Sequence, residues 1–380
     1  MRNSTNGRAA ASGARTRLAR TWTGSSASSE STLHQLSPYI GKTKSSMAGS
    51  LVLQFTRPGD LVYDPFCGSG TIALESWIGD RPVIAGDLSP YAYLLTRAKL
   101  FPYTSADAAM RDIEKAAITV KARRREADLR TVPRWVRRFF HAETLRDVVA
   151  WTTGLRQRRL HFLMACLLGI LHHQRPGFLS FPSSHTVPYL RLKKFPPARF
   201  PELYAYRSVR ERLEAKVRRA LHRVPPLDFG IRRECFLRDS SHFMPSRPVD
   251  AIITSPPYMR QLDYGRDNRL RLWFLGTPDW DGLDKRVSPG EVDFLGLMRR
   301  SFLLWRSVLK RGGVCVLVIG DACSRIQRGD LPELVSRMAT EHVGGYSLLY
   351  QHTESIPNER RVRRHIRGSM SETVLVLRRS

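Results

Sequence analysis

A hydroxyl, two prolines and an aromatic ring follow one another at the end of a strand-like stretch. Residues 251–258 read AIITSPPY, so Ser255 is followed by Pro256, Pro257 and Tyr258. Proline lacks a backbone N–H and holds φ near about −65°, so this pair ends the strand and stiffens the loop after it. The Ser255 hydroxyl and the Pro256 carbonyl could accept hydrogen bonds, and the Tyr258 ring could stack on a planar group. A strand-ending turn without chemistry is the alternative interpretation.

A glycine-rich turn is the second candidate for chemistry. Residues 64–71 read DPFCGSGT, between a strand-like and a helix-like segment. Gly68 and Gly70 permit positive φ and a close approach of the backbone to a ligand. Asp87 ends the next strand-like segment, where a carboxylate can bind ribose hydroxyls. Alone, this pattern also fits a nicotinamide dinucleotide site. A phosphate-binding loop is excluded because Leu36 stands where that motif requires glycine.

The elements that must position these residues alternate between strand and helix. Strand patterns at 61–66 and 81–87 are each followed by a helical one, which predicts a parallel sheet. Strand patterns resume at 234–240, 249–258, 312–322, 346–352 and 372–379. We therefore expect an α/β fold with a doubly wound, mostly parallel sheet. Its expected organisation is a disordered basic arm at 1–30, a catalytic domain at 31–103 and 231–380, and a helical insertion at 104–230.

The charge of the chain indicates a polyanionic partner. The 380 residues carry a net charge of +28, and the insertion alone holds 26 Lys and Arg against 11 Asp and Glu. Basic runs at 123–126, 134–140, 156–159 and 358–369 are interspersed with aromatic residues, as expected for a surface that follows a nucleic-acid backbone. A solvated helix face is the alternative for any single run. We expect the insertion to recognise the target site on a nucleic-acid partner.

Cysteine usage and hydropathy bound the class of protein further. The five cysteines show no CxxC pair, which predicts a reducing compartment and no metal site. The longest apolar run, 160–171, is too short to cross a bilayer and predicts a buried helix rather than a membrane partner. We expect a cytoplasmic protein associated with the nucleoid. Residues 1–30 also resemble an organellar transit peptide in composition.

DPFCGSGT and TSPPY together resemble the DNA methyltransferases that modify exocyclic amino groups, the N4-cytosine and N6-adenine family with unpermuted motif order. Segments 34–44, 137–148 and 255–276 resemble further stretches of that family. The resemblance implies a Rossmann-like class I methyltransferase fold, S-adenosylmethionine as cofactor and no metal. It also implies double-stranded DNA with a flipped base as substrate, and a restriction endonuclease as a possible partner.

The resemblance also implies roles for individual residues. The expected cofactor site consists of Asp64, Phe66, Gly68, Gly70 and Thr71 at the methionine and ribose end, Asp87 on the ribose hydroxyls, and Asp239 near the adenine. The expected catalytic residues are Ser255, Pro256, Pro257 and Tyr258. A serine before the prolines favours cytosine N4 over adenine N6 in this family. A methyltransferase acting on RNA base amino groups, a non-catalytic nucleic-acid-binding protein and a nicotinamide enzyme remain alternatives.

Several other residues invite a functional interpretation. Asp263 and Tyr264 could line the target pocket or cap a helix. Cys67 is expected only to fill a crowded turn, and Asp321 to serve the fold. The isolated histidines are expected to be surface or capping residues; they are His34, His141, His185 and His365.

Overall fold

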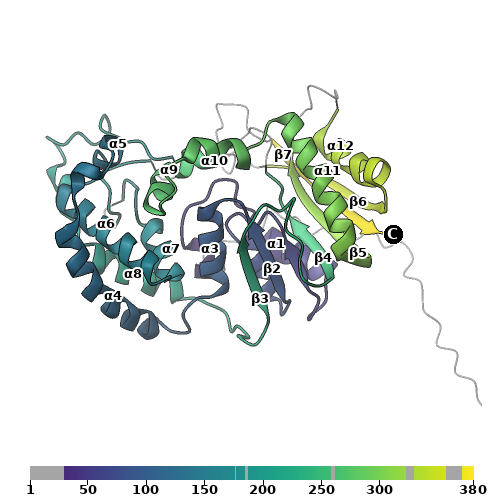
Figure 1. Cartoon of the computed structure of the whole chain (residues 1–380), viewed down its shortest axis with the longest axis horizontal. Coiled ribbons are helices and arrows are strands. Elements are labelled where there is room, and N and C mark those ends of the chain that lie inside the picture. Colours follow the sequence, from purple (N-terminus) through teal and green to yellow (C-terminus); the bar gives the residue numbers. More distant parts are fainter. Residues whose placement is uncertain (1–29, 176, 185–186, 258–261, 322–328, 357–369) are drawn as a thin grey trace, which may run out of the picture.

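The computed structural model describes residues 30–380 except 176, 185–186, 258–261, 322–328 and 357–369. A seven-stranded sheet forms its centre, in the order β3-β2-β1-β4-β5-β7-β6 (Figure 1). The strands are β1 (Val62–Asp64), β2 (Val83–Asp87), β3 (Arg233–Leu237), β4 (Val249–Thr254), β5 (Leu309–Gly320), β6 (Tyr346–Ser355) and β7 (Ser371–Arg379). The first five strands pair in parallel, whereas β7 runs antiparallel to both β5 and β6.

Helices cover both faces of this sheet because its strands are apolar on both sides. Val316 and Val318 of β5 pack with α1 (Ser45–Phe55) on one face. Cys315 and Leu317 pack with α11 (Glu291–Val308) and α12 (Leu331–Arg337) on the other. The alternation follows from the two-residue period of a strand. Helices α2 (Thr71–Ile78) and α3 (Pro90–Leu100) follow β1 and β2 as expected from the sequence.

The expected doubly wound α/β fold is confirmed. This strand order, with one antiparallel strand inserted near the edge, is that of the Rossmann-like class I S-adenosylmethionine-dependent methyltransferase fold. The chain winds outward in opposite directions from β1 and β4, which are neighbours in the sheet. Ligands of such sheets bind at the carboxyl ends of the strands at this switch point. Both motifs of the sequence lie there, because DPFCGSGT follows β1 and TSPPY ends β4.

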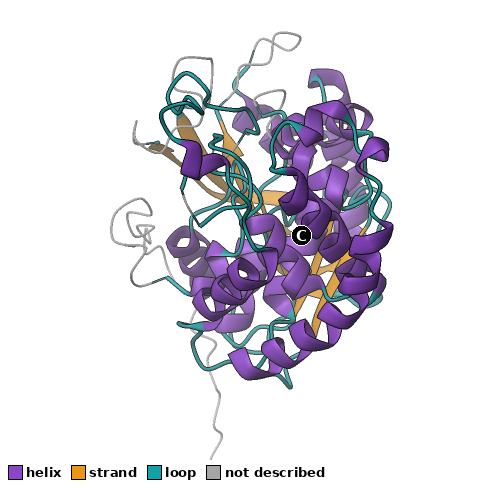
Figure 2. Cartoon of the chain, turned by 90° about the vertical axis from the view of Figure 1, so that its left-hand side faces the viewer, coloured by secondary structure: helices purple, strands orange, loops and turns teal. Residues whose placement is uncertain are grey.

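Residues between α3 and β3 form a helical lobe beside the sheet (Figures 1 and 2). Its helices are α4 (Ala106–Glu126), α5 (Arg134–Arg137), α6 (Ala142–Gln157), α7 (His161–Gly169) and α8 (Val209–Leu221), and it contains short 3₁₀ turns at Leu129–Thr131 and Pro201–Tyr204. A further 3₁₀ turn, Thr32–Gln35, precedes α1. The apolar run at 160–171 is indeed a buried helix, α7. Apolar side chains of α7 belong to one continuous core with those of α2 and α3, so the lobe shares its core with the sheet domain.

Two helices connect the lobe side to the catalytic edge. These are α9 (Tyr264–Phe274) and α10 (Trp280–Val287), which pack against each other above the sheet (Figure 1). A π-helical turn, Met338–Val343, follows α12. Within the described ranges, no helix is both long and apolar enough to span a membrane.

Candidate active site at the carboxyl edge of the sheet

The glycine-rich turn is bent tightly against α3. Gly68 and Gly70 have φ of 50° and 72°, and Gly70 is the N-cap of α2. A Cβ at Gly70 would lie 2.6 Å from the Thr96 Oγ1 and 2.8 Å from its Cα, so only glycine fits. Cys67 is buried and accepts a hydrogen bond on its sulfur from Thr96, as expected for a residue that fills a crowded turn.

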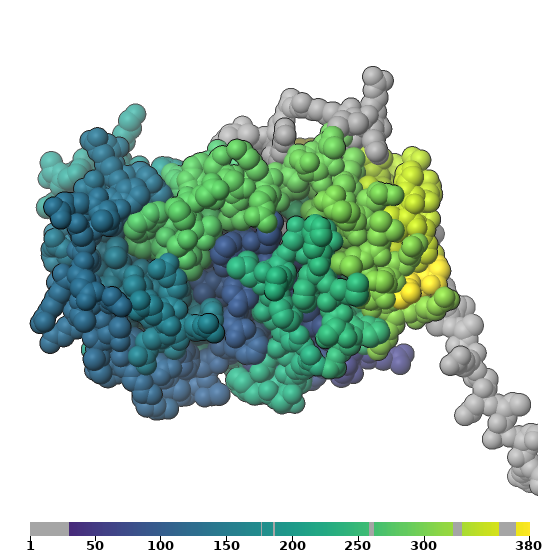
Figure 3. All heavy atoms as spheres, viewed as in Figure 1, coloured from purple at the N-terminus to yellow at the C-terminus, as the bar shows by residue number. Residues whose placement is uncertain are grey.

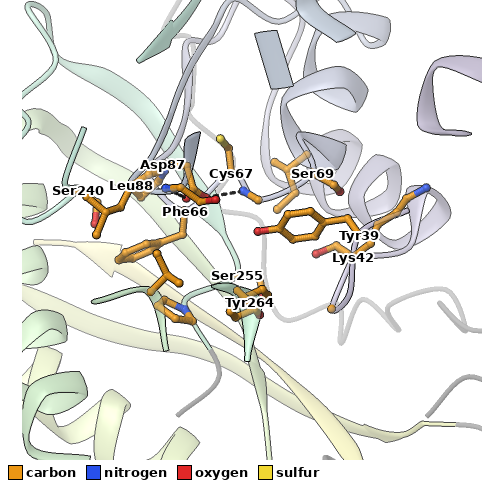
Figure 4. Close-up of a pocket in the computed structure, with 18 of the residues that line it drawn as sticks. Tyr39, Lys42, Phe66, Cys67, Ser69, Asp87, Leu88, Ser240, Ser255 and Tyr264 are labelled. Atoms are coloured by element: carbon orange, nitrogen blue, oxygen red, sulfur yellow. Dashed lines mark hydrogen bonds between the residues drawn. The ribbon is translucent and has the colours of Figure 1, made fainter. Parts of the chain in front are cut away.

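Asp87, at the end of β2, holds the turn in place. Its carboxylate accepts hydrogen bonds from the backbone N–H of Gly68 and of Ser89, each over 2.8 Å (Figure 4). Burial raises the pKa of Asp87 to about 6, and the hydrogen bonds from Ser89, Gly68 and Leu88 act in the opposite direction. The carboxylate oxygens retain further lone pairs, so Asp87 can still accept hydrogen bonds from a ligand.

A single threonine joins the two motifs. The Thr254 hydroxyl donates to Asp64 Oδ1 over 2.7 Å and accepts from the backbone N–H of Phe66 over 3.2 Å. Asp64 is 1% exposed, and its Oδ2 has no hydrogen-bond partner among the described residues. Burial raises the pKa of Asp64 to about 7, while the hydrogen bond from Thr254 lowers it and the charge of Asp87 raises it.

An open cavity of about 860 Å³, including its mouth, lies between the motifs (Figure 4). The sequence-predicted residues that line it are Phe66, Gly68, Thr71, Asp87, Asp239, Ser255 and Pro257. Asp64, Gly70 and Pro256 are not among the lining residues, because Asp64 and Pro256 are buried behind the wall and Gly70 is packed on Thr96. Tyr258 lies outside the described residues.

Ser255 is oriented by a neighbouring strand. Its hydroxyl donates to the Val318 carbonyl of β5 over 3.0 Å, while the residue also lines the cavity. A hydroxyl whose only proton is engaged can serve a further ligand solely as a hydrogen-bond acceptor. Ser255 Oγ is therefore left as a hydrogen-bond acceptor, which is what binding of an amino group requires.

Asp239 lies beyond β3 on the same side of the cavity. Its Oδ1 accepts hydrogen bonds from the backbone N–H and the hydroxyl of Ser241, over 2.9 and 2.8 Å. Burial alone would raise the pKa of Asp239, but these bonds and the nearby His242 outweigh burial and lower it. Asp239 is therefore a charged acceptor at the end of the cavity that Ser240 also lines.

Aromatic residues that sequence reasoning left without a specific role complete the wall. Tyr39 lines the cavity, with ring centroids 6.0 Å from Tyr91 and 5.9 Å from Tyr264. Tyr264, the first residue of α9, also lines it, and the N-cap position of that helix is taken by Asp263. The only sequence signal for Tyr39 was the family resemblance of segment 34–44.

The further lining residues come from three separate segments. Lys42 and Thr43, Arg286 and Val287 of α10, and Leu297 of α11 also line the cavity. The Lys42 ammonium points away from it and donates to Glu30 and to the His34 carbonyl (Figure 4).

The expectation for His34 was wrong. His34 is 2% exposed, and its Nε2 lies 2.6 Å from Glu75 Oε1. Burial lowers the pKa of His34, because the charged imidazolium loses its hydration. His141, in contrast, caps α6 through a hydrogen bond from the Glu143 N–H, as expected. His185 and His365 lie outside the described residues.

The chemistry of the cavity fits S-adenosylmethionine. The carboxylates of Asp87, at the end of β2, and Asp239, just after β3, suit ribose and adenine donors, and the Phe66 ring offers an apolar face. Gly68, without a Cβ, leaves the backbone of the turn open towards the Tyr39 ring. No cluster of three or more His, Cys, Asp or Glu side chains that could hold a metal occurs in the described part of the chain.

Comparison with known proteins agrees with this chemistry. Residues 39–132, which include the turn, Asp87 and α3, match the family described as RMKL-like, methyltransferase domain. No curated protein matches the chain.

Solved structures are similar in their overall course. TrmN from Thermus thermophilus is 15% identical with a TM-score of 0.35; the match covers 90% of this chain but only 50% of TrmN. An rRNA methylase from Streptococcus thermophilus is 10% identical with a TM-score of 0.33, over 90% of this chain and 98% of that one. The rRNA methyltransferase aviRa from Streptomyces viridochromogenes is 13% identical with a TM-score of 0.34, over 94% and 95%.

Sequence identities and TM-scores this low do not identify the substrate. The sheet topology, the glycine-rich turn and the family match of residues 39–132 converge on one conclusion. Residues 39–132 match a methyltransferase domain, and they lie in a sheet with the strand order of the S-adenosylmethionine-dependent methyltransferase fold.

Proposed function

We propose that the protein transfers a methyl group to the exocyclic amino group of a base in a nucleic acid. The observation that carries this proposal is the Ser255 hydroxyl, which donates to Val318 and lines the same cavity as Gly68 and Asp87. An acceptor on one wall and a cofactor-binding turn on the other are what amino-group methylation needs.

The chemical difficulty lies in the nucleophile, since the lone pair of an amino group on a base is delocalised into the ring. Ser255 Oγ lines the cavity and supplies an acceptor for one N–H bond of the amino group, which favours a tetrahedral nitrogen. The family resemblance assigns the other N–H bond to the Pro256 carbonyl, although Pro256 is buried behind the cavity wall in this structure. The prolines keep both acceptors fixed, so positioning supplies much of the rate. S-adenosylmethionine, held by the glycine-rich turn, Asp87 and Asp239, would supply the methyl group and be left as the thioether S-adenosylhomocysteine, and the surplus amino proton would pass to solvent.

The donor would be held by residues on the opposite wall. Asp87 would accept hydrogen bonds from the ribose hydroxyls, and Asp239 would lie at the adenine end. Phe66, Gly68 and Thr71, which line the same cavity, would contact the methionine and ribose end of the donor. Asp64 supports this site from behind through Thr254 rather than by contact with the donor.

Cytosine N4 in DNA is the first candidate target, because a serine precedes the two prolines, and adenine N6 is its near variant. Tyr258 would then stack on the base after it leaves the duplex. An amino group in RNA is the second candidate. RNA is tested alongside DNA for two reasons. Two of the similar proteins named above are rRNA methyltransferases. Both polymers also present the same phosphate charge to a protein with a net charge of +28.

Mass spectrometry of nucleosides tests the proposal. Purified protein and S-adenosylmethionine are incubated in parallel with duplex DNA, single-stranded DNA and total RNA, and the digested nucleosides are compared. N4-methylcytosine or N6-methyladenine from DNA, or an amino-methylated base from RNA, supports the proposal and names the polymer. Ser255→Ala serves as the negative control. A ring-methylated base, or no product with any of the substrates, contradicts it.

The helical lobe is proposed to recognise the target, on account of its 26 basic residues and its position next to α9 and α10. Replacing 104–230 with the lobe of a relative that methylates a different site should transfer that specificity. An unchanged pattern of methylated sites would refute this role.

A further inference from the structure

A second cavity lies between the helical lobe and the helix pair α9–α10. It measures about 710 Å³ including its wide mouth. Four aromatic and two basic side chains dominate its wall: Trp135, Phe139, Tyr189, Trp280, Arg138 and Arg269. Figure 3 shows atoms of the lobe, in blue and teal, beside the green atoms of α9 and α10. None of these residues belongs to the first cavity.

Both α9 and α10 run from one cavity to the other. Tyr264 of α9 lines the first cavity and Arg269 the second, a separation of about 7.5 Å along the helix axis. Helix α10 runs the opposite way, from Trp280 at the second cavity to Arg286 at the first.

Helices α9 and α10 are in direct contact with each other. The Gly265 N–H donates to Asp284 Oδ1 over 2.8 Å, which ties α9 to α10. A Cβ at Gly265 would overlap the Trp280 carbonyl oxygen, so the two backbones are in direct contact.

The basic side chains of the second cavity are already oriented. Arg269 donates to the Pro188 carbonyl over 2.6 Å, and its guanidinium lies 5.9 Å from the centre of the Trp135 ring. Burial and the neighbouring Arg266 lower the pKa of Arg269, yet an arginine keeps its charge at neutral pH. Arg138 is exposed at the mouth.

Three of the aromatic side chains remain partly exposed to solvent. Tyr189 is 51% exposed, an unusual fraction for a large ring, and Trp135 and Trp280 are only partly buried. Flat rings next to guanidinium groups match one ligand chemistry well, a base that stacks and a phosphate that pairs with the charge.

We propose that this second cavity binds an unstacked nucleotide that neighbours the methylated one in the same nucleic-acid strand. The proposal rests on the proposed function for the identity of the first cavity, and it adds a second binding position lined by the same two helices. The base stacks on Tyr189 and Trp280, and Arg138 contacts the phosphate.

Binding of short oligonucleotides tests this without turnover. The probe is a fluorescein-labelled single strand of about 12 nucleotides, in DNA and RNA versions, and a matched strand that lacks bases. Tyr189→Ala and Trp280→Ala should each weaken binding of the complete strand about ten-fold, and should leave binding of the abasic strand unchanged. Arg138→Ala should weaken binding of both strands.

Two substitutions in the same lobe provide matched controls. Tyr206→Ala removes a tyrosine of similar exposure, 49%, and Arg219→Ala removes an exposed arginine, both away from the cavity. Both should bind the strands like the unaltered protein. S-adenosylmethionine binding by calorimetry verifies that each variant is folded; if Trp280→Ala fails this check, Tyr189→Ala decides.

The outcomes separate the two proposals. Wild-type affinity in Tyr189→Ala, or an equal loss on complete and abasic strands, overturns the nucleotide site. A protein that methylates no polymer overturns the proposed function only, because the binding comparison needs neither methyl donor nor turnover.

Discussion

Asp64 and Thr254 are 190 residues apart in the chain, yet the Thr254 hydroxyl donates to Asp64 Oδ1 over 2.7 Å. Because the same hydroxyl accepts from the Phe66 N–H, the end of β4 and the start of the glycine-rich turn form one unit. The wall that carries the glycine-rich turn and the wall that carries Ser255 are therefore positioned together. A disturbance of this link should affect both.

Thr254→Val removes the link without changing the shape of the side chain. A buried carboxylate and the Phe66 N–H then lose a partner, which should destabilise the protein by about 1–3 kcal/mol. Urea denaturation measures the loss. Thr254→Ser, which keeps the hydroxyl, should remain within about 1 kcal/mol of the unaltered protein. Equal stabilities of the Val and Ser variants would show that the link carries no energy.

Ser255→Ala should lower kcat for methyl transfer by about 100-fold, because one positioned hydrogen-bond acceptor is lost at the reacting nitrogen. The dissociation constant of S-adenosylmethionine should not change. Ser307→Ala is a matched control, since the Ser307 hydroxyl also donates to a backbone carbonyl but lies exposed on α11. A variant at Ser255 with full kcat would remove this residue from the catalytic site.

Asp87→Asn should weaken S-adenosylmethionine binding about ten-fold, because a charged acceptor is replaced by a neutral amide. The pKa of Asp87 is raised to about 6, so affinity of the unaltered protein should increase as the pH rises through that value. The Asn variant should lack this step. Calorimetric titrations on both sides of about pH 6 measure it, with the exposed Asp80→Asn as control. If the unaltered protein and Asp87→Asn show the same change of affinity with pH, the titration belongs to another group.

Asp64 should make stability fall with rising pH. Its pKa is about 7 in the folded chain against a reference value of 3.8, so between these values the folded chain binds a proton that the unfolded chain has released. The free energy of unfolding then decreases as the pH rises, the reverse of a salt-bridged aspartate. Asp64→Asn keeps an acceptor for Thr254 and should reduce this decrease by on the order of 2–4 kcal/mol. If the free energies of unfolding of the unaltered protein and of Asp64→Asn change in the same way with pH, this role of Asp64 is contradicted.

Gly70→Ala should be more destabilising than Gly59→Ala. Both glycines have positive φ, 72° and 87°, but a Cβ at Gly59 meets open space, whereas one at Gly70 lies within 2.9 Å of three Thr96 atoms. Backbone strain costs about 1–3 kcal/mol at either position, and overlap adds to it only at Gly70. The difference between the denaturation midpoints of the two variants measures the effect of the steric overlap with Thr96. Equal losses would mean that α3 moves aside freely.

Local patterns were enough to predict the elements of the sheet. The apolar segment 81–87 contains β2, the glycine after Ile78 ends α2, and the apolar run at 160–171 contains α7. Period, caps and turn residues act over a few neighbours, so they can be read along the chain. Strand ends were less accurate: β5 begins at Leu309 and β6 extends to Ser355, because pairing with neighbouring strands lengthens both.

The composition of the site depended on contacts between distant segments. The sequence by itself determined the α/β alternation, the two motifs at strand ends and the basic lobe between them. Only the tertiary structure decided that Asp64 supports Thr254 behind the wall, that Tyr39 and Tyr264 share the cavity, that His34 is buried, and that α9 and α10 connect two cavities. The physical reason is that strand order and helix packing bring together residues whose side chains, taken locally, carry no signal of their partners.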